Sequence, residues 1–357
     1  MHGTEELYLS EHLLIRKDSP CRGQDSSGRA TRMDLRSDLD IFKFDTSQAS
    51  TLTLTFDVPT NSGIDHFQIS VRDSVGTILS SHGVGSDLTF STALNGAGTY
   101  YIQVEDDYYY SSGQYSLTGS LTNGTSNRET EGNNSRSTAD VISSGSSITG
   151  QISSRNDNDY YKISTDGAAT ITIDFDAPTN SNSIDYFQAT LLSSAGTVLA
   201  TKKSGQDFSL TAATFQGGDY YLKIENDYYN NGEYIVSSSV TSGTGNYELE
   251  PNNSQNIADS LSSGTSRSGN LSSLSDIDFY EISINEPSEI SVSFDSPTNS
   301  SSKNYFNVSI LDSYGSIIGT KKSGQDFELK ASAKDIGNYF ITVEPENLNT
   351  NQYLISS

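Results

Sequence analysis

Apolar and polar residues alternate along several short segments of this chain. In the first such segment, Leu52, Leu54 and Phe56 are separated by threonines. A period of two places successive side chains on opposite faces of a strand, so that one face is buried and the other is wet. Glycine and asparagine turns separate the segments, and no helical period of useful length occurs. The pattern therefore predicts an all-β chain.

The alternation belongs to a block that occurs three times. The segments FDVPTNS, FDAPTNS and FDSPTNS contain Pro59, Pro178 and Pro297, which are 178 − 59 = 119 and 297 − 178 = 119 residues apart. The same period relates Tyr115, Tyr234 and Tyr353. Internal repetition at a fixed period indicates a tandem architecture. With about eight short strands in each block, it predicts three tandem antiparallel β-sandwiches of jelly-roll type.

The repeat also sets the expected domain boundaries. Residues 1–30 do not match the corresponding part of the second block, and we interpret them as an atypical N-terminal segment outside the repeat. The expected sandwiches comprise residues 31–123, 127–243 and 246–357. The first of them is incomplete at its N-terminus, because its match to the other two stops upstream of about Thr31.

Composition narrows the classes of function. The chain has 357 residues, 45 acidic against 21 basic ones, and a formal net charge of −24. This balance argues against nucleic acid as a partner, because nucleic acid needs a basic surface, and it favours cations. There is no run of about 18 apolar residues, so no membrane insertion is expected. The single cysteine, Cys21, excludes a disulfide within the chain.

A set of motifs recurs at fixed places in the blocks. The third block carries nearly all of it: the opening ELEPNN from Glu248, the segment DIDFY from Asp276 and the segment GNYF from Gly337. In combination these motifs resemble the bacterial pre-peptidase C-terminal domain family, which includes the collagen-binding domains of clostridial collagenases. The second block has Gly132 in place of the proline, and the first has only the part from Asp38 onward. The resemblance implies secreted, non-catalytic β-sandwich modules, often attached to extracellular proteases.

The resemblance also implies calcium sites, since the acidic opening binds calcium in the collagen-binding members of the family. The implied ligands in the third block are Glu248, Glu250, Asn252, Asn253, Asp276 and Asp278. Their counterparts in the second block are Glu129, Glu131, Asn133, Asn134, Asp157 and Asp159. The first block lacks the opening acids, so Asp38 and Asp40 alone are expected to bind calcium poorly.

The chemistry of these side chains agrees with calcium. Ca²⁺ takes about six to eight oxygen ligands, from carboxylates and amides among others, at about 2.3–2.6 Å. Two acidic groups that are distant in sequence can supply them if the opening segment folds back beside the first strand of its block. The alternative interpretation is a solvated linker whose asparagines form turns. No EF-hand loop occurs in the sequence.

Tyrosines crowd the loop before the last strand of the first two blocks. They are Tyr108, Tyr109, Tyr228 and Tyr229. Tyrosine offers flat, amphipathic contact area at low entropic cost, which suits a contact surface for extracellular protein or polysaccharide. The alternative, which we favour, is a hairpin whose rings cover the end of the sandwich.

We expect no catalytic site in this chain. A Ser–His–Asp set needs a histidine base, and His66 and His82 of the first block have no histidine counterparts in the other blocks. A pair of glycosidase carboxylates is disfavoured by the repetition, because tripled blocks rarely each hold an active site.

Together these features predict a secreted or cell-surface protein that is not an enzyme. It would bind or target extracellular protein or polysaccharide and hold calcium at the block junctions. One alternative is the C-terminal remnant of a larger secreted protease or other hydrolase, and another is a structural stalk or cell-surface spacer. Residues 1–23 lack the features of a signal peptide, so we expect any secretion signal to precede the given sequence.

Overall fold

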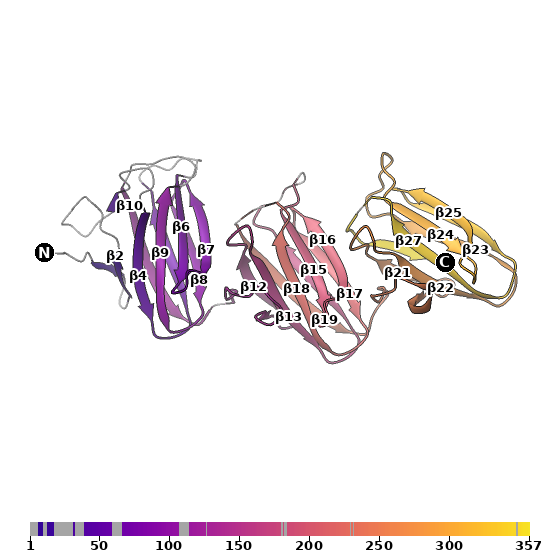
Figure 1. Ribbon diagram of the computed structural model, residues 1–357, viewed down its shortest axis with the longest axis horizontal. Helices are drawn as coiled ribbons and strands as arrows, with labels where there is room; N and C mark the ends of the chain where they lie inside the picture. The colour runs from indigo at the N-terminus through magenta and orange to yellow at the C-terminus, as the bar shows by residue number, and fades with distance from the viewer. Residues whose placement is uncertain are drawn as a thin grey trace. The chain divides into compact units, whose positions relative to one another are not determined.

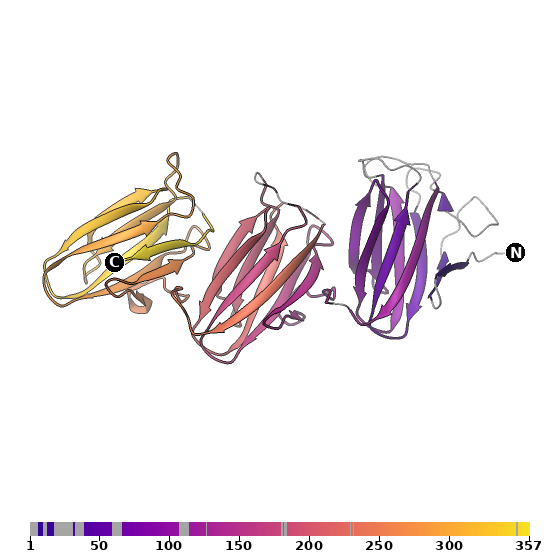
Figure 2. The ribbon, with the colours of Figure 1, turned by 180° about the vertical axis from the view of Figure 1, so that it is seen from behind.

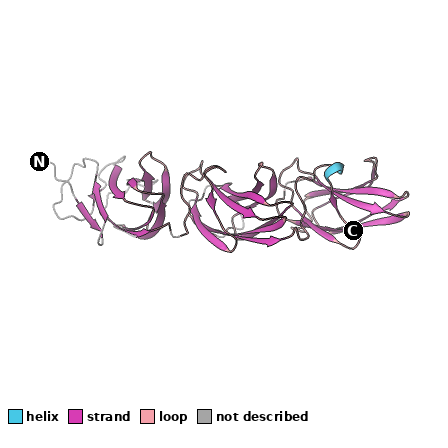
Figure 3. Ribbon diagram, turned by 90° about the horizontal axis from the view of Figure 1, so that it is seen from below, coloured by secondary structure: helices cyan, strands magenta, loops and turns pink. Residues whose placement is uncertain are grey.

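The computed structural model describes most of the chain. The described residues are 6–9, 13–17, 31–32, 39–58, 66–106, 114–125, 127–179, 181, 184–228, 230, 232–347 and 349–357. They are predominantly strands, and their one helical element is a single 3-10 turn, η1 (Gln255–Ile257) (Figure 3). The prediction of an all-β chain is confirmed. None of the helices in this described part has the length and apolar character needed to cross a membrane.

The described residues form two compact units. One comprises the described residues of Met1–Asp140, Ile148–Asp159 and Tyr229–Ile235. The other comprises those of Val141–Ser147, Tyr160–Tyr228 and Val236–Ser357.

The first unit contains two complete sheets, with the strand orders β1-β2-β4-β9-β6-β7 and β3-β10-β5-β8. The first sheet consists of β1 (Glu6–Leu9), β2 (Leu13–Lys17), β4 (Leu39–Thr46), β9 (Gly98–Asp106), β6 (Phe67–Asp73) and β7 (Ile78–Val84). The second consists of β3 (Thr31–Arg32), β10 (Gln114–Asn123), β5 (Ser50–Asp57) and β8 (Leu88–Leu94). Phe56 of β5 meets Phe67 of β6 in a shared core, with ring centroids 5.5 Å apart. The two sheets therefore form a sandwich (Figure 1).

Residues 140–242 form a second pair of sheets, with the orders β11-β13-β18-β15-β16 and β12-β19-β14-β17. The first consists of β11 (Asp140–Val141), β13 (Asn158–Thr165), β18 (Gly218–Asn226), β15 (Phe187–Ser193) and β16 (Val198–Ser204). The second consists of β12 (Ser146–Gln151), β19 (Glu233–Ser242), β14 (Ala169–Asp176) and β17 (Phe208–Thr214). Phe175 of β14 and Phe187 of β15 join the two layers, with ring centroids 5.1 Å apart.

A third pair lies in the second unit, with the orders β20-β22-β27-β24-β25 and β21-β28-β23-β26. The first sheet consists of β20 (Asp259–Ser260), β22 (Asp278–Ile284), β27 (Gly337–Pro345), β24 (Phe306–Leu311) and β25 (Ile317–Ser323). The second consists of β21 (Ser266–Gly269), β28 (Tyr353–Ser356), β23 (Ser288–Asp295) and β26 (Phe327–Ala333). Phe294 of β23 meets Phe306 of β24 with ring centroids 5.0 Å apart. Figures 1 and 2 show the two layers from opposite sides.

The three pairs share one topology, and we call them the first, second and third sandwich. The order β4-β9-β6-β7 recurs as β13-β18-β15-β16 and as β22-β27-β24-β25. Residues that the alternation placed inside are inside, since Leu52, Leu54 and Phe56 are all fully buried. The predicted fold of tandem antiparallel sandwiches is therefore confirmed, while the domain boundaries drawn from the repeat remain a prediction.

The N-terminal segment differs from the corresponding part of the other sandwiches. Strands β1 and β2 pair antiparallel, and β2 continues antiparallel onto β4, with Arg16 opposite Lys43. The third sandwich has the short strand β20 at this edge, and β20 pairs with β22 in parallel. The sequence did not predict that part of residues 1–30 joins the first sheet.

Candidate metal centre

Two groups of buried carboxylates form at corresponding places in the second and third sandwiches. Glu129, Glu131 and Asp159 each place one carboxylate oxygen within 4.8 Å of the others, and Glu248, Glu250 and Asp278 do the same. A buried asparagine adjoins each group. We call Glu129, Glu131, Asn133 and Asp159 the Glu129 cluster, and Glu248, Glu250, Asn252 and Asp278 the Glu248 cluster. Every member is buried.

Local backbone structure explains how the acids of the opening segment come to one side. In the third sandwich the Glu248 N–H donates to the carbonyl of Ser268 in β21, at 3.0 Å. Four residues later, the Asn252 carbonyl accepts the N–H of Phe279 in β22, at 3.1 Å. The segment thus runs from one sheet to the other. The segment bends at Glu250 between these two bonds, and it brings the two glutamates and the asparagine beside Asp278 at the start of β22.

The buried asparagine of each cluster leaves its amide oxygen free. Asn133 Nδ2 lies 3.4 Å from Glu129 Oε2, and Asn252 Nδ2 lies 3.4 Å from Glu248 Oε2. The Oδ1 atoms of Asn133 and Asn252 are buried without a hydrogen-bond partner. The amide nitrogen therefore satisfies a carboxylate, while the amide oxygen is available as a ligand.

The same three positions carry unpartnered oxygens in both clusters. They are Glu131 Oε1, Asn133 Oδ1 and Asp159 Oδ1, and Glu250 Oε1, Asn252 Oδ1 and Asp278 Oδ1. A buried acceptor without a partner costs roughly 1–3 kcal/mol, and more when it is charged. A hard cation satisfies several such acceptors at once. The donor set of each cluster, made only of oxygens, fits such an ion.

Tyrosine hydroxyl groups bond the second oxygen of each aspartate and one oxygen of Glu248. Tyr234 donates to Asp159 Oδ2, and Tyr353 donates to Asp278 Oδ2. In the third sandwich, Tyr280 also donates to Glu248 Oε2, at 2.8 Å. These bonds fix the rotation of the carboxylates and leave one oxygen of each aspartate unpaired.

The first sandwich keeps one part of this arrangement. Asp40 is fully buried, and its Oδ2 accepts the Tyr115 hydroxyl at 2.6 Å. Asp38, which the sequence paired with Asp40, lies outside the described residues.

The remaining predicted ligands hold the loops around the clusters. Asp157 Oδ2 accepts both the backbone N–H and the hydroxyl of Ser153, at 2.7 and 2.8 Å, and Asp276 Oδ2 accepts the same pair from Ser272. Asn134 and Asn253 are exposed, and their Oδ1 atoms accept backbone N–H groups at 2.9 and 3.3 Å. The structure thus places these two asparagines outside the buried clusters.

Burial and mutual repulsion hold protons on the clusters. Burial raises the pKa of Glu248 to about 8. Burial, followed by the charge of Glu248, raises the pKa of Glu250 to about 9. The pKa values of Asp278, Asp159 and Glu131 are also raised well above their ordinary range, again with burial as the largest cause. Several carboxylates confined in one buried volume need protons or a cation.

Sequence reasoning missed a further acid in each of the second and third sandwiches. Asp140 Oδ2 accepts the Thr130 N–H at 2.7 Å, and Asp259 Oδ2 accepts the Leu249 N–H at 2.8 Å. These bonds fix the residue between the two glutamates of each opening segment. The available signal was the repeat itself, because 259 − 140 = 119.

The predicted tyrosine surface is described only in part. Tyr108, Tyr109 and Tyr229 lie outside the described residues. Tyr228 is exposed, and its ring centroid lies 6.1 Å from that of Tyr186. A contact role for these tyrosines stays a prediction.

Comparison with known proteins adds a family match for part of the chain. Residues 38–106 match the family model of the Bacterial pre-peptidase C-terminal domain. The matched residues include Asp40 and precede both carboxylate clusters. No curated protein matches the chain.

Several solved structures are similar to the chain. The pre-peptidase C-terminal domain of a collagenase from Bacillus anthracis is 20% identical, with a TM-score of 0.24; the match covers 28% of this chain and 94% of that domain. A triple jelly-roll protein of an archaeal virus is 10% identical, with a TM-score of 0.24; the match covers 90% of this chain and 83% of the viral chain. The tandem CBM22 domains of Xyn10C from Paenibacillus barcinonensis are 10% identical, cover 64% and 91%, and have a TM-score of 0.21.

Proposed function

We propose that this chain is a secreted or cell-surface binding protein without catalytic activity, and that the Glu129 and Glu248 clusters each hold a calcium ion. The single observation that carries the calcium proposal is the repeated set of unpartnered buried oxygens at corresponding positions. An acidic cluster alone has many explanations. A cation at that place would satisfy the same three oxygens in both clusters, which supports the proposal.

Calcium suits the ligands and their spacing. Oxygens at about 2.3–2.6 Å from one calcium ion are separated by at most about 5 Å, and the three carboxylate oxygens of each cluster lie within 4.8 Å of one another. Two glutamates, one aspartate and one asparagine supply a large part of a shell of about six to eight oxygens, which water can complete. Zinc prefers histidine and cysteine ligands, and neither residue type belongs to these clusters.

The ion would hold the opening segment to its sandwich. Three of the ligands, Glu248, Glu250 and Asn252, lie before β20, the first strand of the third sandwich. The fourth, Asp278, is the first residue of β22. A ligand that binds the folded form and not the unfolded one stabilises the fold by mass action. We therefore assign calcium a structural role at the start of the second and third sandwiches.

The hydrogen-bonded pair Ser80 and His82 is poorly suited to catalysis. Ser80 Oγ lies 3.0 Å from His82 Nε2, but Ser80 is buried. Nδ1 of the ring lies 3.5 Å from the Gln151 amide nitrogen, at the place where the base of a nucleophile–base pair has an orienting carboxylate. The ring also packs on Phe90, with ring centroids 4.2 Å apart. Burial, with the charge of Arg128, lowers the pKa of His82 to about 4, so the ring is a weak base. These features support the part of the proposal that gives this pair no catalytic role.

Calorimetric titration of the full chain with calcium tests the proposal. We expect two calcium ions per chain, and one in the variant Glu250→Gln, which replaces a ligand oxygen while keeping the side-chain shape. The matched control is Glu289→Gln, because the Glu289 side chain is 61% exposed and pairs with Lys330 away from the cluster. Absence of calcium binding, or equal binding by the Glu250 variant and the control, would refute the assignment.

A further inference from the structure

An amide side chain caps the edge of the first sandwich. Strand β7 is the last strand of its sheet, so its outward N–H and C=O groups are not paired by a neighbouring strand. Gln151 Oε1 accepts the Ser81 N–H at 3.0 Å, and Gln151 Nε2 donates to the Ser81 carbonyl at 3.0 Å. One side chain thus reproduces the two bonds that a residue of a paired strand would make.

Asn270 occupies the corresponding place one period later, since 270 − 151 = 119. Its Oδ1 accepts the N–H of Thr201 at 2.9 Å, and Thr201 lies on the edge strand β16. Its Nδ2 donates to the Thr350 carbonyl at 2.7 Å. The next outward N–H of β16, that of Lys203, donates to Thr350 Oγ1 at 3.2 Å. Asn270 therefore belongs to a small set of groups that cover this edge.

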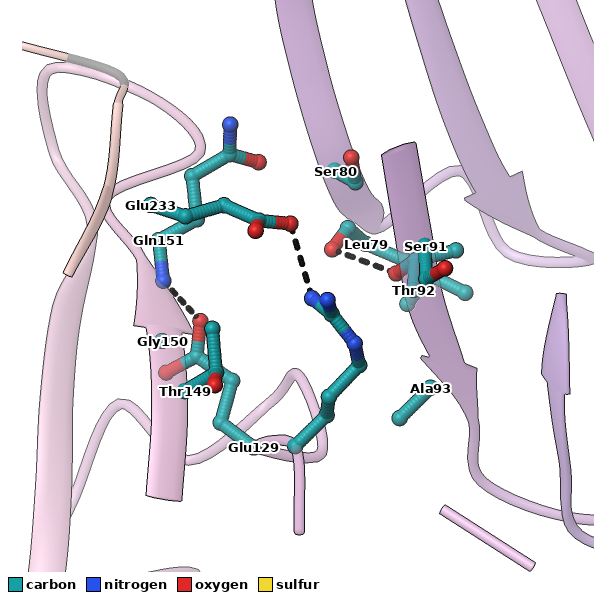
Figure 4. Close-up of a pocket in the computed structure, with 11 residues that line it drawn as sticks. Leu79, Ser80, Ser91, Thr92, Ala93, Glu129, Thr149, Gly150, Gln151 and Glu233 are labelled. Atoms are coloured by element: carbon teal, nitrogen blue, oxygen red, sulfur yellow. Dashed lines mark hydrogen bonds and ion pairs between the residues drawn. The ribbon is translucent and has the colours of Figure 1, made fainter. Parts of the chain in front are cut away.

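Both residues also bind a carboxylate of the neighbouring cluster through their backbone. The Gln151 N–H donates to Glu129 Oε1, and the Asn270 N–H donates to Glu248 Oε1. Figure 4 shows the bond between Gln151 and Glu129, with Leu79 and Ser80 of β7 nearby. A single residue thus contacts a cluster glutamate with its main chain and the edge strand with its side chain.

Two further contacts link the segments around the Glu129 cluster to the same sandwich edge. Asn95, which directly follows β8, donates from Nδ2 to the carbonyl of Glu131, at 2.8 Å. Ser153 Oγ lies 3.3 Å from the carbonyl of Ile78, the first residue of β7. The opening segment, which carries Glu131, and the loop that carries Asp157 therefore both contact this edge.

We propose that Gln151 and Asn270 couple cation binding to the capping of strands β7 and β16. The inference rests on the proposed function, in which the clusters hold calcium. An ion that fixes the Glu129 and Glu248 carboxylates also fixes the N–H groups bonded to them, and with these the side chains that cap the edges. Coupling of this kind is reciprocal, so capping of the edge strand strengthens cation binding by the same factor by which the cation strengthens capping.

Amide hydrogen exchange measured by NMR on the full chain reads the coupling directly. The Ser81 N–H reports on Gln151, and the Thr201 N–H reports on Asn270. In the wild type we expect calcium to slow exchange at both amides by roughly 5- to 150-fold, the usual range of coupling between sites. Thr320 occupies the corresponding position of β25 and is exposed, so its amide should not respond.

Two variants serve as controls for each other. Asn270→Ala keeps the backbone bond to Glu248, and it should abolish the calcium response at Thr201 while leaving that at Ser81. Gln151→Ala should do the reverse. The coupling is refuted if calcium slows Thr201 exchange in Asn270→Ala as much as in the wild type, or if neither amide responds. Calcium titration of the same samples separates the calcium proposal from the coupling proposal. If no calcium binds, both proposals fail. If calcium binds but each variant keeps the response at its own reporter amide, only the coupling proposal fails.

Discussion

The Tyr353 hydroxyl donates a hydrogen bond to Asp278 Oδ2, and the other oxygen of that carboxylate, Oδ1, is buried without a partner. Tyr234 and Asp159 make the same pair in the second sandwich. In each case the tyrosine belongs to the last strand of the sandwich, and the aspartate belongs to β13 or β22 in the opposite sheet. The pair therefore orients one candidate ligand from a part of the chain about 75 residues away.

Removal of the Tyr353 hydroxyl should weaken calcium binding at the Glu248 cluster. The ring of Tyr353 stacks on Phe294 with centroids 5.2 Å apart, so Tyr353→Phe keeps the core packing. A hydrogen bond to a charged group contributes roughly 1.5–3 kcal/mol, and we expect up to that loss in the binding free energy of one site. Titration calorimetry measures it. Tyr339→Phe is the control, because the Tyr339 hydroxyl bonds the Asp335 carbonyl instead; an equal loss there would contradict the prediction.

Calcium removal should lower the melting temperature of the protein. A ligand at 100 times its Kd stabilises the folded state by about 2.7 kcal/mol. Differential scanning calorimetry with calcium, and then with chelator, measures the shift. In the double variant Glu250→Ala, Asp278→Ala, we expect the third sandwich to lose its response and the second to keep it. A calcium response of unchanged size in this variant would show that the ion binds elsewhere.

Much of the candidate site follows from residue spacing. Glu248 and Glu250 are two residues apart, which places them on one face where the segment is extended. The segment bends at Glu250, so this rule does not extend to Asn252, which is buried, or to Asn253, which is exposed. The hydrogen bonds of Asn252 to Glu248 and Phe279, rather than residue type, separate the buried asparagine from its neighbour.

Other parts of the site depend on tertiary contacts that spacing does not contain. Asp259 reaches the opening segment through the Leu249 N–H, and Asn270 reaches Glu248 through its own N–H. Both have counterparts 119 residues earlier, but so do many residues whose role is only to fill the core. Tyr353 decides which oxygen of Asp278 stays unpaired, and it lies on β28 of the opposite sheet, far away in sequence.

A methyl group at Gly269 should disturb the third sandwich beside its cluster. A Cβ atom there would lie 2.3 Å from the Tyr353 hydroxyl oxygen and 2.6 Å from that of Tyr280. Overpacking of a buried site costs roughly 1–3 kcal/mol, so Gly269→Ala should lower both the unfolding free energy and the calcium affinity. Urea unfolding and titration measure the two effects. Gly167→Ala is the matched control, because its Cβ would meet no atom within 4 Å; comparable losses in both variants would contradict the steric cause.

The metal-free protein should become less stable as the pH rises from about 4.5 to about 9. The carboxyl groups of Glu248 and Glu250 have an ordinary pKa of 4.5, which the unfolded chain keeps, whereas in the folded state their pKa values are about 8 and about 9. Between these limits the folded state binds more protons than the unfolded state, so the unfolding free energy falls with rising pH. The contribution of these two groups to the unfolding free energy is therefore largest below pH 4.5, and it is lost by about pH 8 to 9.

Calcium should reverse this trend, because the ion takes the place of the protons and binds best when the carboxylates are ionised. Urea unfolding at pH 5.5, 7 and 8.5, with chelator and with saturating calcium, measures both slopes. The variant Glu250→Gln cannot ionise at that position, so its metal-free slope should be shallower than that of the wild type. A metal-free stability that rises with pH over this range would mean that the buried carboxylates ionise without a cation, and the reason for assigning one to the Glu248 cluster would be lost.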